Sequence, residues 1–312
     1  MVLQKNITNI CEILMIEKIA RWIGHNLKIA GMTRLLSIIY PCIPSANRYL
    51  SGVYDLPDGL RMKLDSRNII DWNLIFQGEY EPHVTRLLKQ LSPIGGVAVD
   101  VGANIGRHTL SLAQSVGSTG IVLAFEPNPK IYEILQSNIA LNQLNHSRAY
   151  DIALGDAKGI ASLRVPKEGT AEYSNMGLAS ISALDTPHDL VNVQVRSLDD
   201  VIADTDIARL DVVKIDVQGY ECKVLDGMRD ILSKYSPAVV FEYEAWAWQK
   251  AGADIDHAIQ LFHAAGYSLW QIFDLSVKPL VLTSHIPEHV ELLALKQNDP
   301  RLDQLLSGVV TA

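Results

Sequence analysis

Two acidic residues and two glycines in the first half of the chain have the types and spacing of a nucleoside-binding site. Asp100 lies inside an apolar stretch, Val97–Val101, that runs straight into a turn from Gly102 to Gly106. An apolar stretch at helical spacing follows, so the pattern predicts a buried strand, a tight turn and a helix start. Glu126 ends a second apolar stretch about 20 residues later, where a carboxylate can accept hydrogen bonds from both ribose hydroxyls. The spacing therefore predicts an adenosine-containing cofactor.

The glycine spacing distinguishes between two classes of cofactor. A dinucleotide fingerprint requires G-x-G-x-x-G, because the pyrophosphate must touch the backbone at the helix N-terminus. This chain has Gly102-Ala-Asn-Ile-Gly106, which fails that pattern. Asp100, two residues before the first glycine, is a poor neighbour for a pyrophosphate and suits the ammonium or sulfonium of S-adenosylmethionine. The pattern favours S-adenosylmethionine, and a purely structural strand, turn and helix is the alternative.

Three further side chains are candidates for catalysis. Asp216 ends the fourth expected strand and Glu242 the fifth, and the carboxyl ends of strands in an open α/β sheet line the ligand crevice. A methyl transfer from S-adenosylmethionine needs alignment of the reactants, and an acceptor group that carries a proton also needs a base. We expect Asp216 to be the base or an orienting group, and Glu242 to help hold the acceptor. His108, beside the glycine turn, is a second candidate base; for each residue a structural role is the alternative.

The same carboxylates raise the question of a metal. Asp216, Glu221 and Glu242 together could hold Mg²⁺, which prefers carboxylate oxygens, although their spacing matches no recognised metal signature. Aromatic side chains follow the fifth strand and predict either core packing or stacking on a sugar ring. These aromatic residues are Tyr243, Trp246 and Trp248.

Length and composition limit the classes of protein to which the chain can belong. A chain of 312 residues suffices for one large domain, or for one domain with an appendage. The net charge of −8 argues against general binding to nucleic-acid phosphates. The three cysteines have no metal-ligand spacing, and neither a signal-peptide pattern nor a long apolar run is visible. These features predict a soluble cytoplasmic protein.

Residues 1–50 are predicted to form an N-terminal helical segment in which basic side chains outnumber acidic ones. A cap helix packed on the domain, or a homodimer contact, is the favoured interpretation. Peripheral contact of an amphipathic helix with anionic lipid is the alternative. Glu12 and Glu17 dilute the basic face, so membrane contact is not favoured.

The rest of the chain alternates between strands and helices. Residues 51–95 predict a hairpin around Asp58-Gly59 and a helix that leads into the core. Residues 96–312 predict a doubly wound, mostly parallel α/β sheet of seven strands, with an antiparallel last strand from the apolar stretches 267–273 and 289–296. An excursion at about 156–210 is expected to be an ordered β-hairpin that holds a substrate loop, residues 173–182.

Several motifs, in order along the chain, resemble the FkbM-type S-adenosylmethionine-dependent methyltransferases. They are VDVGANIG, AFEPNP, NIALN, ALGD, NMGLAS, RSLDD, KIDVQGYECKVLDGM and VVFEYE. The resemblance covers about residues 78–240. It implies a class I methyltransferase (Rossmann-like) fold and methyl transfer to oxygen, often to a hydroxyl of a sugar, glycolipid or polyketide-type metabolite.

The resemblance also implies roles for individual residues. Glu126 would hold the ribose, and Asn128 or the turn from Ala153 to Asp156 would border the adenine. The methionine half of the cofactor would contact Asp100, Gly102, Asn104 and Gly106. The chain departs from the family at Gln218, where Glu is more usual, so this position loses any role as a base or strong metal ligand. It also departs at Arg107-His108, where an aromatic pair is common.

Two other functions stay open on the sequence. One is an NAD-dependent oxidoreductase, which the missing dinucleotide fingerprint disfavours. The other is a non-catalytic cofactor-binding subunit with an assembly or regulatory role, which the carboxylates at the strand ends disfavour. The expected partner is a small-molecule or glycosylated acceptor.

Overall fold

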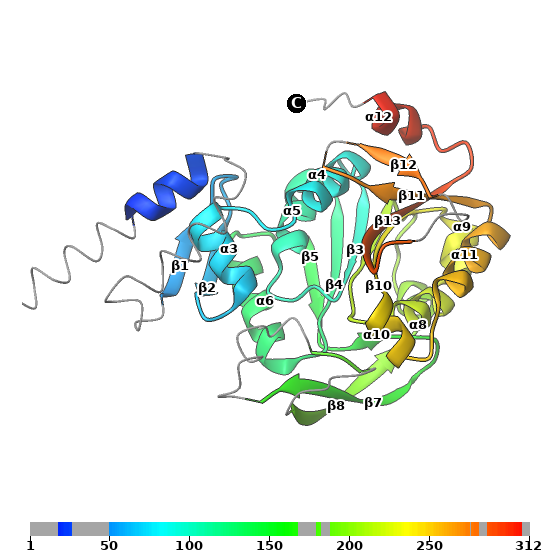
Figure 1. Ribbon diagram of the computed structural model, residues 1–312, viewed down its shortest axis with the longest axis horizontal. Helices are drawn as coiled ribbons and strands as arrows, with labels where there is room; N and C mark the ends of the chain where they lie inside the picture. The colour runs from blue at the N-terminus through cyan, green and yellow to red at the C-terminus, as the bar shows by residue number, and fades with distance from the viewer. Residues whose placement is uncertain are drawn as a thin grey trace, which may run out of the picture. The chain divides into compact units, whose positions relative to one another are not determined.

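The computed structural model describes residues 18–26, 50–167, 179–181, 188–274, 276–280 and 286–307. The chain divides into two compact units, Met1–Tyr80 and Glu81–Ala312, which are described separately (Figure 1). Most of the expected substrate loop, residues 173–182, lies outside the described residues, and so do Cys11 and Cys42.

The first unit contains a hairpin and two helical segments. Strands β1 (Ser51–Asp55) and β2 (Arg61–Asp65) pair antiparallel around the expected turn. Helix α3 (Ile69–Gln77), which the sequence patterns did not predict, follows them and begins at an Asn cap. Within the predicted N-terminal segment, residues 18–26 are helical, and the His25 ring nitrogen Nε2 lies 3.0 Å from a backbone carbonyl of α3.

The core of the second unit is an eight-stranded sheet with the order β12-β11-β13-β10-β9-β3-β4-β5. Strands β3, β4, β5, β9 and β10 run parallel, while β13 is antiparallel to both β10 and β11. The strands are β3 (Val97–Val101), β4 (Ile121–Phe125), β5 (Ser147–Tyr150), β9 (Val212–Ile215), β10 (Ala238–Glu244), β11 (Tyr267–Ile272), β12 (Val277–Pro279) and β13 (His289–Lys296). This confirms the doubly wound class I methyltransferase fold that the sequence predicts, with β12 as a short additional edge strand.

Helices cover both faces of this sheet because successive side chains of a strand point to opposite faces. Val97, Val99 and Val101 of β3 belong to one core, which includes residues of α8, α9 and α11. Ala98, between them, belongs to a second core with α4 and α5 (Figure 1). The helices are α4 (Pro82–Leu91), α5 (Arg107–Val116), α6 (Pro129–Leu141), α7 (Leu198–Ala203), α8 (Glu221–Asp226), α9 (Arg229–Lys234), α10 (Ala245–Lys250), α11 (Ile255–Ala264) and α12 (Arg301–Ser307).

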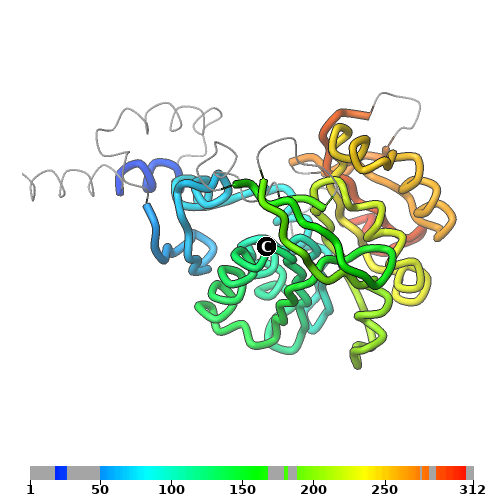
Figure 2. Tube along the Cα trace, turned by 90° about the horizontal axis from the view of Figure 1, so that it is seen from below, coloured from blue at the N-terminus to red at the C-terminus, as the bar shows by residue number. Residues whose placement is uncertain are grey.

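The single strand expected at residues 148–154 is divided between two sheets. Tyr150 of β5 pairs with Phe125, the last residue of β4, so β5 has no neighbour to pair with beyond that point. The chain turns there, and β6 (Ala153–Leu154) joins a separate sheet with the order β6-β8-β7. Strands β7 (Gly159–Pro166) and β8 (His188–Arg196) form the hairpin predicted for the excursion, and Figure 2 shows it in front when the molecule is seen from below.

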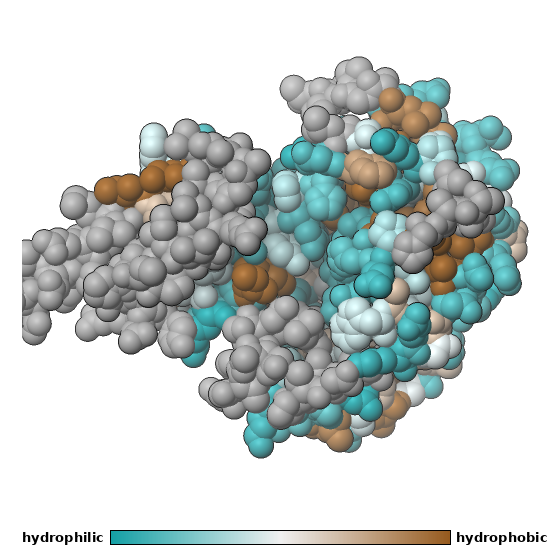
Figure 3. Space-filling model, in the orientation of Figure 1, coloured by the Kyte–Doolittle hydropathy of each residue, from teal (hydrophilic) through white to brown (hydrophobic). Residues whose placement is uncertain are grey.

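The described helices are all too short or too polar to cross a bilayer. Figure 3 shows hydrophilic side chains over much of the visible face of the second unit, with the hydrophobic ones in small separate groups.

Candidate active site

The turn after β3 is shaped by close backbone contacts. Gly102 has a φ of +76°, and a Cβ at this position would lie 1.8 Å from the backbone oxygen of Asp216. Only glycine fits there, because any side chain would collide with the end of β9. The N–H groups of Gly102 and of the next residue both donate to the Phe125 carbonyl, at 3.0 and 2.9 Å. The turn is therefore fixed against the ends of β4 and β9.

Glu126 lies at the end of β4 with its carboxylate turned toward this loop. The backbone N–H of Asn104 donates to one carboxylate oxygen at 2.9 Å, and the N–H of Asn128 donates to the other at 2.8 Å. Burial raises the pKa of Glu126 to about 7, and the charges of Asp100 and Asp216 act in the same direction, against the two backbone hydrogen bonds. A carboxylate has about four acceptor sites, so each oxygen keeps capacity for a ligand hydroxyl.

Asp100 is fully buried in β3. Its Oδ2 accepts a hydrogen bond of 2.6 Å from the Thr109 hydroxyl of α5. Its Oδ1 is buried and has no hydrogen-bond partner within the described part of the chain. An unpaired buried carboxylate oxygen is costly unless a donor or a cation meets it. The residue therefore fits a positively charged ligand group.

The other residues expected to bind the cofactor fall into two groups. Asn104, with a φ of 50°, and Gly106, with a φ of +96°, shape the turn, and Asn128 caps α6 by accepting from the Lys130 N–H. Ala153 is buried in β6, and the Asp156 carboxylate forms an ion pair of 2.6 Å with a lysine of α8. A contact of these last two residues with adenine stays a prediction.

A row of charged side chains crosses four adjacent strands on the face that α4 and α5 cover. Asp100 pairs in register with Lys214 of β9, and Glu242 of β10 pairs with Glu291 of β13. Asp216 comes directly after β9. It lies two residues after Lys214 and therefore on the same face of the sheet. These five residues are called the charged row below. It contains four carboxylates and one ammonium group.

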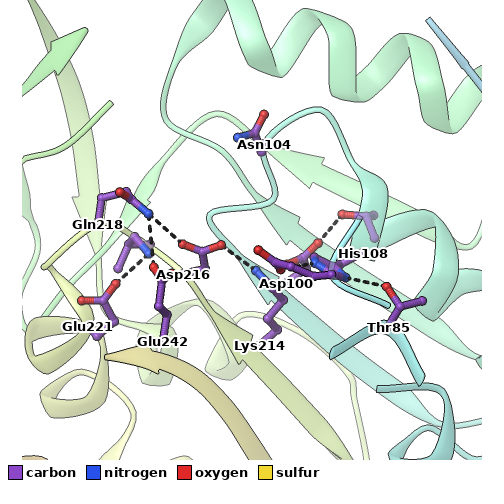
Figure 4. A network of polar contacts seen from close by, with 12 residues as sticks. Thr85, Asp100, Asn104, His108, Lys214, Asp216, Gln218, Glu221 and Glu242 are labelled. Atoms are coloured by element: carbon purple, nitrogen blue, oxygen red, sulfur yellow. Dashed lines mark hydrogen bonds and ion pairs between the residues drawn. The ribbon is translucent and has the colours of Figure 1, made fainter. Parts of the chain in front are cut away.

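Figure 4 shows the hydrogen bonds at the centre of this row. The Lys214 ammonium donates to Asp216 Oδ2 at 3.1 Å. The side-chain amide of Gln218 donates to Asp216 Oδ1 and to Glu242 Oε2, both at 3.2 Å. Gln218 has a left-handed backbone, with a φ of 54°. Gln218 thus links the two carboxylates proposed for catalysis.

Burial and mutual repulsion act strongly on these groups. Burial raises the pKa of Glu242 to about 11, and the Asp216 charge adds to that shift. Burial also raises the pKa of Glu291, to about 8, with the Glu81 and Asp216 charges acting in the same direction. For Lys214, burial works to lower the pKa, but the charges of Asp216 and Asp100 raise it overall. Lys214 is the one cation of the row, and burial with mutual repulsion favours the protonated forms of Glu242 and Glu291.

The three carboxylates that could together hold Mg²⁺ do not form a converging set among the described residues. Glu221 is 1% exposed and accepts the Val217 N–H at 2.9 Å, so it stabilises the turn after β9. Burial raises its pKa to about 8. In the described part of the chain, Glu242 converges instead with His289 and Glu291, whose potential ligand atoms all lie within 4.8 Å of one another.

His108, the second candidate base, lies at the start of α5. It is buried, and its Nε2 lies 3.0 Å from Glu81 Oε2 while its Nδ1 lies 3.4 Å from the Thr85 hydroxyl. Both ring nitrogens thus contact residues at the start of α4. The base role and its alternative, a pocket-wall role, both stay predictions for His108.

The β7–β8 hairpin is connected to the same region. Ser180, which forms a bridge with Arg164 of β7, donates its hydroxyl to the backbone carbonyl of Gln218 at 2.8 Å.

The aromatic residues after β10 separate into two kinds. Trp248 is buried and packs edge-on against Tyr243, whereas Trp246 is 41% exposed.

Three residues of this site were missed by the sequence reasoning: Lys214, His289 and Glu291. A signal was present for Lys214, which is the polar residue within the otherwise apolar strand VVKI and stands two residues before Asp216. The other two alternate with apolar residues at the start of β13. Their proximity to Glu242 depends on the pairing register of β10 with β13, which the sequence pattern does not specify.

The fold, with a glycine turn after β3 and a buried acid after β4, is that of the class I methyltransferases. The family model described as the Methyltransferase FkbM domain matches residues 100–269, and the chain belongs to this family.

Similarity to characterised proteins is moderate. The chain is 28% identical to the hexuronic acid methyltransferase AglP of Haloferax volcanii, over 51% of this chain and 61% of that protein. It is 31% identical to the 31-O-demethyl-FK506 methyltransferase FkbM of Streptomyces tacrolimicus, over 44% of this chain and 60% of that protein. A crystal structure of Methyltransferase FkbM from Methylobacillus flagellatus KT is 17% identical, with a TM-score of 0.41, over 72% of this chain and 52% of that one. The chain thus spans about three fifths of the length of these two curated relatives.

Proposed function

We propose that this chain is an S-adenosylmethionine-dependent O-methyltransferase that acts on a hydroxyl of a sugar, glycolipid or polyketide-type metabolite. The observation that carries the proposal is the pair of buried carboxylates, Asp100 and Glu126, beside the glycine turn. The unpaired Oδ1 of Asp100 suits a cationic group, and the Glu126 carboxylate keeps free acceptor sites for ribose hydroxyls. Membership of the FkbM family supports the same cofactor.

The residues present fit S-adenosylmethionine better than NAD. S-adenosylmethionine supplies a methyl group activated by a positively charged sulfur. In this proposal Asp100 binds the ammonium end of the cofactor, Glu126 binds its ribose, and the turn at Gly102 lets the backbone approach closely. Asp100, two residues before the first glycine of the turn, would repel a diphosphate, which argues against an oxidoreductase.

Asp216 is the group proposed to take the proton from the hydroxyl that becomes methylated. Its carboxylate is 27% exposed and is held between the Lys214 ammonium and the Gln218 amide. A carboxylate suffices for this step, because the hydroxyl becomes strongly acidic as its oxygen bonds to the methyl carbon. The two hydrogen bonds fix the orientation of Asp216, and alignment of the reactants supplies much of the rate.

Two observations support a glycosylated or polyhydroxylated acceptor. The relatives named above act, by their names, on a hexuronic acid and on an oxygen of FK506. Trp246, at the start of α10 directly after β10, is partly exposed, with the Lys250 ammonium 5.1 Å from its ring centroid. An exposed indole next to a strand end offers a flat apolar face for a sugar ring.

Transfer of a labelled methyl group from S-adenosylmethionine to a panel of saccharides, glycolipids and polyhydroxylated macrolides tests the proposal. We expect one acceptor class to yield a methyl ether and one equivalent of S-adenosylhomocysteine. Asp216→Asn should lower kcat by about 100-fold or more, the scale of general-base catalysis, with cofactor affinity unchanged. Asp206→Asn, at an exposed position of the same unit, is the control. Full turnover by Asp216→Asn would exclude the base assignment.

A further inference from the structure

We propose that Glu242, His289 and Glu291 form a binding site for a divalent transition-metal ion, which activates the acceptor hydroxyl. The inference deepens the proposed function and rests on it for the role of the ion. The site lies where the carboxyl end of β10 meets the amino end of β13.

The strand register brings these three side chains together. Glu242 pairs with Glu291 and Glu244 pairs with His289, so all four residues lie on one face of the sheet. His289 Nδ1 lies 3.5 Å from Glu242 Oε1. One potential ligand atom from each of the three residues lies within 4.8 Å of the others. An ion bound at about 2.1 Å from each donor holds neighbouring donors about 3 to 4 Å apart, so small side-chain rotations complete the geometry.

The charge around the three residues favours a cation. Two carboxylates directly opposite each other on paired strands repel one another when both are ionised, and Glu242 is 9% exposed. Lys214 lies near Glu291, but its ammonium donates a hydrogen bond to Asp216. No side chain or backbone group among the described residues donates a hydrogen bond to the Glu291 carboxylate. A partly buried carboxylate without a donor is the group that a metal ion would satisfy.

The two carboxylate oxygens of Glu242 have different neighbours. The Gln218 amide holds Oε2, which leaves Oε1 turned toward His289. Gln218 also contacts Asp216, so the base proposed above and the metal site share one orienting amide. A metal ion at this position would thus lie next to the group that receives the acceptor's proton.

The donor set indicates which metals fit. One imidazole nitrogen and two carboxylate oxygens suit Mn²⁺, Fe²⁺ or Zn²⁺ better than Ca²⁺ or Mg²⁺, which prefer oxygen alone. Three protein ligands leave coordination positions for water or for a substrate oxygen. His289, with 60% of its side chain exposed, lies at the solvent side, so the ion is accessible to an acceptor.

The reaction at such a site needs no reagent besides S-adenosylmethionine and the acceptor. The acceptor hydroxyl binds the ion through oxygen, and its O–H bond weakens because the ion withdraws electron density. The proton passes to the Asp216 carboxylate as the oxygen forms a bond to the methyl carbon. The electron pair of the methyl–sulfur bond returns to sulfur, and S-adenosylhomocysteine leaves.

Titration of the chelator-treated protein with Mn²⁺ and with Zn²⁺, followed by calorimetry, tests the site directly. We expect one equivalent to bind per chain, and His289→Asn and Glu291→Gln each to weaken binding at least tenfold. His263→Asn, at another exposed histidine of the same unit, should bind as the wild type does. A wild type with no saturable site, or variants that bind like the wild type, would overturn the proposal.

Two further measurements separate this proposal from the proposed function. S-adenosylmethionine affinity is measured on the same samples. If the protein binds the cofactor but no metal, the metal site is excluded and the proposed function stands. Turnover is then compared with added Mn²⁺ and with a chelator. We expect at least a tenfold loss in the chelator, and equal turnover in both would exclude the activating role of the ion.

Discussion

At the scale of single residues, the account depends on where charge is buried. Glu126 receives two backbone hydrogen bonds, which favour its ionised form, yet burial still raises its pKa to about 7. In the absence of ligand this carboxylate is therefore only partly ionised at neutral pH. A bound nucleoside that donates ribose hydroxyls to the carboxylate would favour the ionised form.

Cofactor affinity should consequently increase with pH. The ionised fraction of Glu126 rises about tenfold between pH 6 and pH 8 for a pKa near 7, and affinity should follow it and level off above pH 8. Calorimetry with S-adenosylhomocysteine across this range measures the effect. Glu126→Gln should bind at least tenfold more weakly at pH 8 and lose most of the pH dependence. An unchanged pH profile in that variant would mean that another group is responsible.

At the scale of elements, the turn after β3 should be intolerant of any side chain at Gly102. Gly102→Ala places a Cβ 1.8 Å from a backbone oxygen in a left-handed conformation, so β3 and β9 must separate. We expect a loss of about 3 kcal/mol or more in the free energy of unfolding, measured by denaturant titration. Gly159→Ala, in a strand where no atom lies within 4 Å of the added Cβ, should change it little. Equal stability of the two variants would contradict the described packing.

The β7–β8 hairpin should influence the acceptor rather than the cofactor. Ser180→Ala removes the hydrogen bond to the Gln218 carbonyl, worth about 1 kcal/mol, and loosens the residue that orients Asp216 and Glu242. We expect a severalfold higher KM for the acceptor and unchanged cofactor affinity. Ser162→Ala, which removes an exposed hydroxyl contact within the same hairpin, is the matched control. A change in cofactor affinity without a change in KM would contradict this connection.

The elements that sequence predicted best are those fixed by local patterns. Buried apolar runs next to glycine or acidic residues identified β3, β4, β9 and β10, because both faces of a central parallel strand are apolar. The remaining elements depend on long-range strand pairing, which local sequence patterns do not reveal. The division of residues 148–154 between two sheets depends on where β4 ends, and β12 is only three residues long. The convergence of His289 and Glu291 on Glu242 likewise depends on register rather than on local sequence.

At the scale of the whole molecule, buried carboxylates should make stability fall as pH rises. The pKa values of Glu126 and Glu221 are raised from 4.5 to about 7 and about 8. Between pH 4.5 and pH 8 the folded state therefore binds more protons than the unfolded state, and stability decreases with pH across this window. We expect the free energy of unfolding at pH 8 to lie a few kcal/mol below its value at pH 5.

Denaturant titrations at several pH values check this expectation. Glu221→Gln should remove part of the slope, because it abolishes the Glu221 titration while it keeps an oxygen to accept the Val217 N–H. A stability that rises steadily from pH 5 to pH 8 would show that these carboxylates are ionised at ordinary pKa values in the folded protein.

The most direct test of the central claim, that the turn between Asp100 and Glu126 binds a cationic sulfur nucleoside, is calorimetric titration of the protein with S-adenosylmethionine and with NAD. The account predicts one S-adenosylmethionine bound per chain, loss of at least tenfold in affinity in Asp100→Asn, and no binding of NAD. Saturable binding of NAD without any binding of S-adenosylmethionine would contradict it.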